Sequence, residues 1–253
     1  MTSLSTITED EKNRYVIISY MFECAAKLRL SILTTASAAV IYHKCSCYLE
    51  KSDFDQYTLA ATALSLASKY EEEQIKIRDL INVTYRTLHP NQPYLRISQE
   101  YYRLRNTLVD CELFLIRILG FHFQFNHPNK YLLHYFDTLS KWMTITPSTP
   151  IKNNINIIDI AMSILQDTYY DFTLIKDFSP QHIAIAIIYL VIKTYGLNIP
   201  GVTTDEEHIN WMKVFSSTIT ADILVKIITR INTLYKYVER TLEHSSSATK
   251  SHS

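Results

Sequence analysis

Helical periodicity is the feature that most constrains this chain of 253 residues. Apolar residues recur at spacings of three and four through nearly every long segment, the pattern of amphipathic helices. Only three glycines interrupt it (Gly120, Gly196 and Gly201), and they complete no glycine-rich phosphate-binding motif. Hydrophobic residues make up 47% of the chain, so a sizeable core is available. The sequence therefore predicts an all-α protein.

Composition excludes several classes of function. The 25 basic residues balance the 25 acidic ones, which disfavours a strongly basic face for nucleic acid. No apolar run is long enough to span a bilayer, and we expect reduced thiols in a nuclear or cytoplasmic protein. His43, Cys45 and Cys47 suggest a metal site, but residues two apart in a helix do not share a face. We therefore expect no metal and no cofactor.

The first half of the chain reads as five helices. Thr8-Glu9-Asp10-Glu11 has the T-x-x-E form of a capping box, and a helix follows it as far as Leu28. The apolar spacing predicts further helices over 35–49, 56–70, 77–88 and 98–119, with Gly120 as the last stop signal. The 56–70 segment is rich in alanine and apolar all round, which predicts a helix at the centre of a bundle.

The second half repeats this organisation. Helices are expected over 130–142, 155–170, 180–195, 207–216 and 221–242, and Ser179-Pro180 marks a helix start. A shift of 124 residues superimposes the central helices of the two halves, placing Ala60 on Ala184, Leu66 on Leu190 and Lys69 on Lys193. We interpret this as a duplicated five-helix module, with coincidence between two Ala/Leu-rich helices as the alternative.

An unusual segment closes the predicted central helix. Residues 64–80 read LSLASKYEEEQIKIRDL, so Lys69 and three glutamates follow an apolar run. In the simpler interpretation, the helix leaves the core here and Glu71–Glu73 form a solvated end. In the other, Lys69 lies at the lip of a groove that another protein fills. We adopt the first interpretation for the glutamates and the second for Lys69.

Three motifs, in the right order, resemble the cyclin family. Leu66–Glu72 (LASKYEE) resembles the L-A-x-K-x-E-E that ends the third cyclin-box helix of transcription-type cyclins. Arg78–Ile81 (RDLI) is similar to the R-D-I-I that often follows. Glu112–Phe121 (ELFLIRILGF) resembles the E-x-x-[IVL]-L-x-x-L-x-F of the fifth helix. The resemblance extends from about Tyr15 to Tyr237, nearly the whole chain.

The resemblance implies a specific domain organisation. Two tandem five-helix cyclin boxes are expected, an N-terminal box at 12–122 and a C-terminal box at 126–242, followed by a disordered tail at 243–253. One subgroup of transcription-type cyclins is similar in the runs RDLINV, HPNKYLLHY and QHIAIA, which begin at residues 78, 127 and 181. The short tail agrees with this subgroup, because other subgroups carry Arg/Ser-rich or low-complexity extensions.

The resemblance also implies a function and a site. In this family the first box grips the αC helix of a cyclin-dependent protein kinase, and the cyclin itself is not an enzyme. By position, Lys69 and Glu112 would form a polar clamp for that helix, and an apolar floor would be formed by Tyr70, Ile116 and Phe121. Tyr15–Phe22 lacks the M-R-A-I-L-x-x-W segment of cell-cycle cyclins, so no docking patch for R-x-L motifs is expected.

Three alternatives remain open at this point. A nucleic-acid-binding cyclin-box transcription factor would share the fold but should carry a basic face. An enzyme built on helices would use histidines such as His122, His127 and His134, but no metalloprotease motif accompanies them. A passive helical scaffold would bind partners without changing the activity of a kinase.

Overall fold

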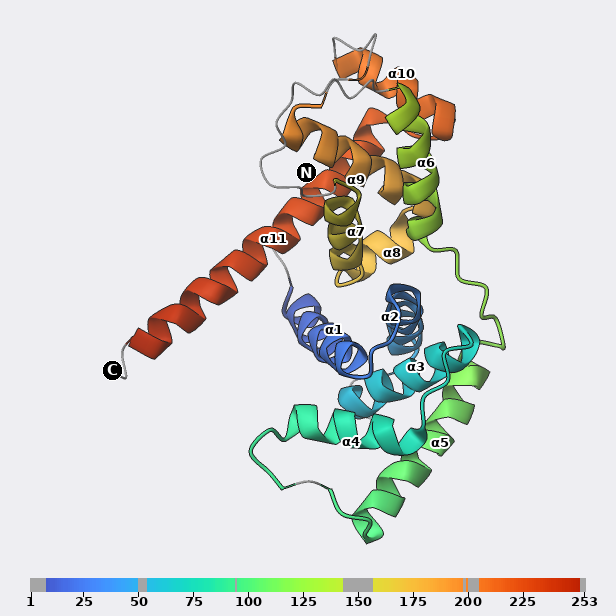
Figure 1. The fold of residues 1–253 in the computed structure, drawn as a ribbon, viewed down its shortest axis with the longest axis vertical. Helices are drawn as coiled ribbons and strands as arrows, with labels where there is room; N and C mark the ends of the chain where they lie inside the picture. Colours follow the sequence, from blue (N-terminus) through green and yellow to red (C-terminus); the bar gives the residue numbers. More distant parts are fainter. Residues whose placement is uncertain are drawn as a thin grey trace. The chain divides into compact units, whose positions relative to one another are not determined.

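The computed structural model describes residues 8–49, 54–93, 95–142, 157–197, 199 and 205–250 (Figure 1). Every regular element within these ranges is a helix, so the all-α prediction is confirmed. The helices are α1 (Glu9–Lys27), α2 (Ile32–Ser46), α3 (Gln56–Tyr70), α4 (Ile77–Leu88), α5 (Gln99–Ile118), α6 (Pro128–Trp142), α7 (Ile157–Thr168), α8 (Phe172–Asp177), α9 (Pro180–Tyr195), α10 (Asp205–Phe215) and α11 (Ala221–Lys250).

The chain forms two compact units. One contains residues 12–127, and the other contains residues from 128 onward together with the described residues up to Glu11. In the first unit α3 contacts α2, α4 and α5, and its residues from Leu59 to Ser68 are all buried. Small side chains such as Ala60 and Ala63 let neighbouring helices approach it closely. The prediction of a central helix over 56–70 is therefore confirmed.

The second unit is organised around α9. Its buried residues from His182 to Ile188 face a core to which α6, α7 and α11 also contribute. This unit has one helix more than predicted, because α8 lies between α7 and α9. Asp171 caps α8 by accepting a hydrogen bond from the Thr173 amide at 2.8 Å. Six residues are too few to show a helical period, so the sequence did not reveal this helix.

The predicted capping box at the start of α1 is present. The Thr8 amide donates to Glu11 Oε2 at 2.7 Å, and the Glu11 amide donates to Thr8 Oγ1 at 3.3 Å. The other Glu11 oxygen accepts from Arg230 Nη2 at 2.6 Å, and Arg230 Nε donates to Asp171 at 2.7 Å. Burial works to raise the pKa of Glu11, but the Thr8 amide and the Arg230 guanidinium together hold it below its usual value.

The end of the chain differs from the prediction. The expected disordered tail over 243–253 is helical as far as Lys250, because α11 continues beyond Leu242. No glycine or proline occurs between Ala221 and Lys250, and the serines at 245–247 cost a helix only modestly. The last three residues, 251–253, lie outside the described residues.

The acidic cluster after α3 also differs from the prediction. α3 ends in a turn in which the Glu73 amide donates to the Ser68 carbonyl at 2.8 Å, with Glu72 in the left-handed region at φ 59°. This turn brings the Glu73 carboxylate to the first turn of α2. The Ser31 amide donates to it at 2.9 Å and the Thr34 hydroxyl at 2.6 Å.

Glu71 takes part in a second contact with α2. Its carboxylate accepts a hydrogen bond from the Ser37 hydroxyl at 2.5 Å, and Ser37 is fully buried. Of the three glutamates, Glu72 is exposed, whereas Glu71 and Glu73 are partly buried. The expectation of a solvated helix end is therefore wrong for Glu71 and Glu73. The cluster stabilises the packing of α2 on the end of α3, and periodicity along the chain cannot reveal such long-range partners.

A pH-dependent contribution to stability follows from this contact. The Thr34 hydroxyl and the Ser31 amide lower the pKa of Glu73, because they favour the charged carboxylate. We predict that Glu73→Ala destabilises the protein at neutral pH by about 1 kcal/mol, as expected for the loss of its hydrogen bonds with the Ser31 amide and the Thr34 hydroxyl. The Glu73 contribution is complete above the ordinary glutamate pKa and disappears as the pH falls through the lower, folded-state pKa.

Urea denaturation of wild type and variant between pH 7 and pH 3 measures this contribution. Glu72→Ala is the matched control, since it removes an exposed carboxylate one position away. If the loss of unfolding free energy in Glu73→Ala stays constant down to pH 3, the charge on Glu73 does not contribute to stability.

Candidate functional site

The structure brings the two predicted clamp residues into direct contact. Lys69, in the last turn of α3, donates from Nζ to Glu112 Oε2 on α5 at 2.6 Å. The two side chains differ strongly in exposure, at 60% for Lys69 and 11% for Glu112. The carboxylate is therefore anchored in the protein, while the ammonium group faces outward and has donors left for other acceptors.

Sequence reasoning missed a third member of this group. The Ser65 hydroxyl donates to Glu112 Oε1, so each carboxylate oxygen has its own donor from α3. Ser65 lies one helical turn before Lys69 and only 6% of its surface is exposed. The signal available in the sequence was the spacing of four residues, which puts Ser65 and Lys69 on the same face of α3.

The predicted apolar residues lie at the ends of the same two helices. Tyr70 closes α3 and is 40% exposed, and Phe121 follows α5 and is 73% exposed. Ile116 is partly buried and lies one turn after Glu112. The structure adds two aromatic residues that the sequence did not single out. The Tyr70 ring lies 6.1 Å from that of Phe123 and 5.4 Å from that of Phe125.

The backbone at Phe121 adopts a costly conformation. Gly120 has φ 56°, as the predicted stop signal requires, and Phe121 follows it with φ 60°. The left-handed region costs a non-glycine residue about 1–2 kcal/mol. No burial of the Phe121 ring compensates for this cost, since the ring is mostly exposed. Backbone strain of this kind is found preferentially at functional sites.

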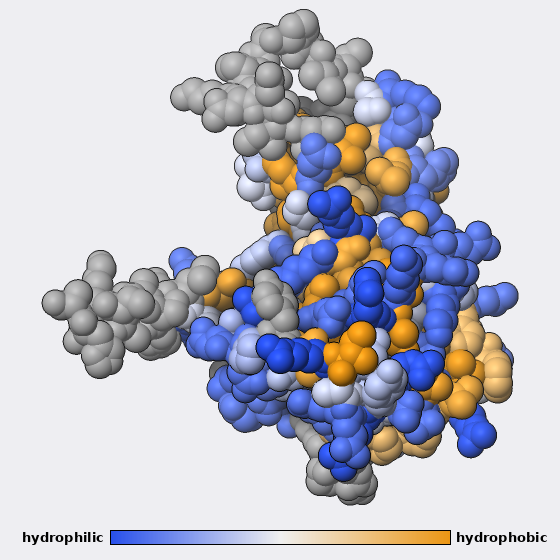
Figure 2. Space-filling model, turned by 60° about the horizontal axis from the view of Figure 1, so that its bottom comes forward, coloured by the Kyte–Doolittle hydropathy of each residue, from blue (hydrophilic) through white to orange (hydrophobic). Residues whose placement is uncertain are grey.

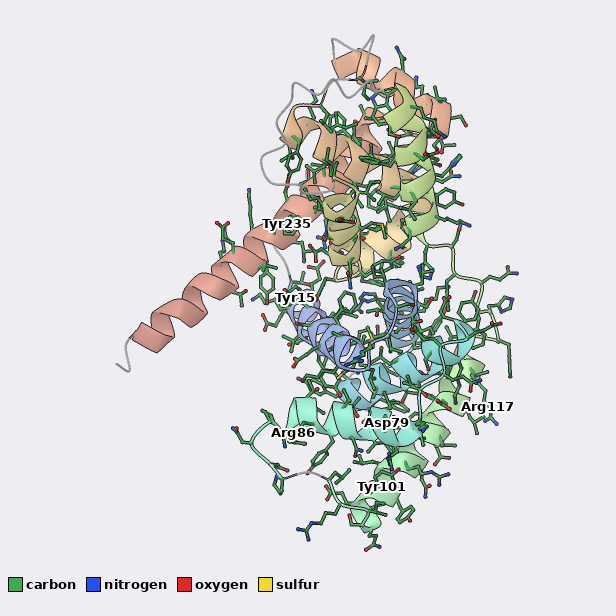
Figure 3. All side chains as sticks on the ribbon, viewed as in Figure 1. Tyr15, Asp79, Arg86, Tyr101, Arg117 and Tyr235 are labelled. Carbon is green, nitrogen blue, oxygen red and sulfur yellow. The ribbon has the colours of Figure 1, made fainter. Side chains whose placement is uncertain are left out.

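Exposed apolar side chains continue along α5. Val109 is 38% exposed and Leu113 is 57% exposed, and both share the face that carries Glu112 and Ile116. Arg117, also exposed, projects from the last turn of this helix (Figure 3). Figure 2 shows hydrophobic side chains interspersed with hydrophilic ones on the face it presents.

The histidines and cysteines have structural explanations. His127 is 9% exposed and its Nε2 lies 2.9 Å from the Ser37 hydroxyl. The same hydroxyl donates to the Glu71 carboxylate. His43 and Cys45 are buried in α2, and the exposed Cys47 donates from Sγ to the His43 carbonyl at 3.2 Å. Within the described ranges, no group of three or more His, Cys, Asp or Glu side chains is placed to hold a metal.

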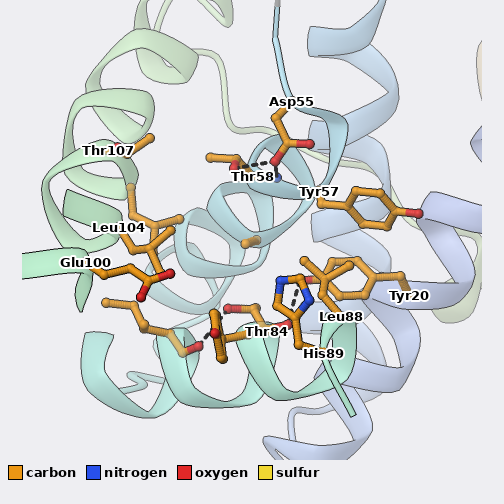
Figure 4. Close-up of a pocket in the computed structure, with 14 residues that line it drawn as sticks. Tyr20, Asp55, Tyr57, Thr58, Thr84, Leu88, His89, Glu100, Leu104 and Thr107 are labelled. Carbon is orange, nitrogen blue, oxygen red and sulfur yellow. Dashed lines mark hydrogen bonds between the residues drawn. The ribbon is translucent and has the colours of Figure 1, made fainter. Parts of the chain in front are cut away.

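The first unit also contains a cavity of about 240 Å³ (Figure 4). It lies between α1, α3, α4 and α5, and is lined by Tyr20, Tyr57, Leu104 and Glu100 among others. Asp55, at its rim, caps α3 by accepting from the Thr58 amide at 2.9 Å. None of the clamp residues lines this cavity, so it is separate from the candidate site.

Comparison with known proteins agrees with this fold. Residues 2–124 match the family described as "Cyclin, N-terminal domain". The chain is 26% identical to mouse cyclin-L2 over 224 residues, covering 86% of this chain and 39% of that protein. It is 24% identical to human cyclin-K, covering 89% and 37%. Cyclin pch1 of Schizosaccharomyces pombe is 23% identical, with 92% and 64% covered. The chain thus spans well under half of the two mammalian relatives.

Two solved structures share the fold. One is the CAK complex of Chaetomium thermophilum bound to ATP-gamma-S, with a TM-score of 0.61, 16% identity, and coverage of 93% of this chain and 66% of that one. The other is the yeast RNA Pol II CTD kinase CTDK-1 complex, with a TM-score of 0.58, 15% identity, and coverage of 83% and 68%. The predicted all-α cyclin-box fold is therefore confirmed, and residues 2–124 resemble a cyclin N-terminal domain.

The strain at Phe121 leads to a prediction about stability. Glycine adopts the left-handed region without the steric cost of a Cβ atom. We predict that Phe121→Gly stabilises the isolated protein by about 1 kcal/mol, whereas Phe121→Ala, which keeps the Cβ atom, brings no such gain. Chemical denaturation of both variants decides this, and equal stabilities for the glycine and alanine variants would contradict the assignment of strain.

Proposed function

We propose that the protein is a transcription-type cyclin, a regulatory subunit that binds and allosterically activates a cyclin-dependent protein kinase. The observation that carries the proposal is the Lys69–Glu112 pair, with a distance of 2.6 Å between Nζ and Oε2, bordered by exposed Tyr70 and Phe121. Two observations support it: the similar proteins named above are cyclins, and the similar CTDK-1 structure is a kinase complex.

The geometry suits the docking of a foreign helix. Lys69 offers unused N–H donors to the carbonyl groups that end a helix, and Glu112 holds the lysine in place. Tyr70, Ile116 and Phe121 provide apolar area next to these charges. Aromatic side chains and fixed charged pairs of this kind supply most of the binding energy in many interfaces. Exposed aromatic surface is unfavourable in an isolated protein, and a partner would cover it.

The proposed mechanism is a population shift. A kinase of this class alone holds its αC helix rotated outward, and its αC glutamate then fails to pair with the lysine that orients ATP phosphates. A cyclin that binds the inward state of αC more tightly than the outward state increases the population of the inward state. The ratio of its affinities for the two states limits the size of that increase. The protein needs no catalytic group and no cofactor for this role. The first box, 12–122, would bind the kinase, and 126–242 would form the second box.

We further propose a subgroup and a kinase. The runs beginning at Arg78, His127 and Gln181 resemble cyclin-Q, the activator of cyclin-dependent kinase ten, so a kinase of that type is the expected partner. We expect the complex in the nucleus, the cytoplasm or both. Among the described residues, no helix is both long and apolar enough to cross a membrane.

Charge reversal at the exposed member of the pair tests the site. We predict that Lys69→Glu weakens binding of the kinase roughly thirtyfold or more, in line with losses of about 2 kcal/mol and above for disrupted interfacial charge pairs. Helicity should remain close to that of wild type, because the Lys69 side chain is largely solvated. Co-expression with a panel of cyclin-dependent kinases, scored for pull-down and for kinase activity, measures the effect.

Two control variants sharpen this experiment. Lys76→Glu makes the same charge change at an exposed position before α4 and should leave binding intact. The double variant Lys69→Glu with Glu112→Lys restores a pair of opposite charges within the protein. Its exposed position 69 presents a negative charge to the kinase, so binding should stay lost. Normal activation by Lys69→Glu would refute the site. Binding without activation by the wild-type protein would favour a scaffold.

A further inference from the structure

Both oxygens of the Glu112 carboxylate are bound by residues of α3. Ser65 Oγ donates to Oε1 and Lys69 Nζ donates to Oε2, and these two donors are four residues apart on one helix face. The Glu112 side chain is only 11% exposed, so little water reaches its carboxylate. The arrangement is a three-residue unit in which a buried hydroxyl and an exposed ammonium group share one carboxylate.

The two donors do not contribute equally to the position of that carboxylate. An ion pair with a lysine that is 60% exposed is weak, so Lys69 by itself does little to fix the carboxylate. The Ser65 hydroxyl, in contrast, is short, buried and carried by the central helix of the unit. A buried carboxylate oxygen left without a donor is costly, so without Ser65 the Glu112 side chain would turn toward water. Lys69 would then lose its fixed acceptor.

We propose that Ser65 is a positioning residue for kinase binding: it fixes Glu112, and through Glu112 it holds the Lys69 ammonium group ready for the partner. This inference rests on the proposed function and assigns the kinase interface a residue that does not touch the kinase. Fixing side chains before binding reduces the entropy lost on association. For the one long side chain that is fixed for the partner, Lys69, the expected gain in affinity is about three- to tenfold.

Ser65→Ala is the direct test, and the chain offers a matched control. Ser68 is also a buried serine of α3, but its hydroxyl donates to the Ser65 carbonyl at 2.8 Å and not to Glu112. We expect Ser65→Ala to weaken kinase binding about three- to tenfold, and Ser68→Ala to leave it unchanged. Ser65→Thr keeps a hydroxyl at the same position and should restore affinity.

A double-mutant cycle separates positioning from a general loss of stability. In a Glu112→Gln background, Ser65→Ala should have little further effect on affinity, because the carboxylate through which it acts is already gone. Full additivity of the two substitutions in kinase affinity would overturn the proposal. So would unchanged affinity of Ser65→Ala in the otherwise wild-type protein.

A measurement on the free protein distinguishes this inference from the proposed function. The NH₃⁺ signal of Lys69 in ¹⁵N-detected NMR reports whether the ammonium group is held in its ion pair. We expect the signal in wild type and Ser68→Ala, and its loss in Ser65→Ala. If that pattern holds but no kinase binds the wild type, the kinase assignment fails while Ser65 still positions Lys69. If the Ser65→Ala signal persists, Ser65 does not position Lys69.

Discussion

The contact between α3 and α5 through Glu112 is the constraint on which the candidate site depends. A carboxylate that is almost fully buried in the first unit must be satisfied on both oxygens, and α3 supplies both donors. This requirement fixes the register of the two helices at the point where both approach their ends. Tyr70 is the last residue of α3 and Phe121 lies three residues after the end of α5, so the same contact determines where the exposed aromatic residues lie.

The acidic cluster beside Lys69 has a different role from the one its composition suggests. Glu73 accepts from the Ser31 amide and the Thr34 hydroxyl at the start of α2, and Glu71 accepts from Ser37, so two of the three negative charges are used inside the unit. Lys69 and Glu72 are thereby left as the exposed charges at the end of α3. The second unit does not repeat this arrangement. The shift that places Lys193 on Lys69 places Lys236 on Glu112, and two lysines cannot form the same ion pair.

Much of the fold follows from local sequence signals. The spacing of apolar residues predicted α3, α4 and α9 with the boundaries that the structure shows, because their start and stop signals are local. The family resemblance predicted that Lys69 and Glu112 border one site, but the direct hydrogen bond between them was not predicted, and Ser65 was missed. The roles of Ser65, Glu71 and Glu73 depend on partners more than thirty residues away. Periodicity contains no information about such pairs, and α8 is too short to show any.

The most direct test of kinase binding at the Lys69–Glu112 site is hydrogen–deuterium exchange of the protein, alone and with a co-purified cyclin-dependent kinase. When the kinase binds, we expect slower exchange in three segments: the end of α3, α5 from Glu112 onward, and residues 121–125. These are the backbone segments that carry the clamp and the aromatic residues. Slower exchange confined to α9–α11, with those segments unchanged, would contradict it, because the kinase would then bind elsewhere.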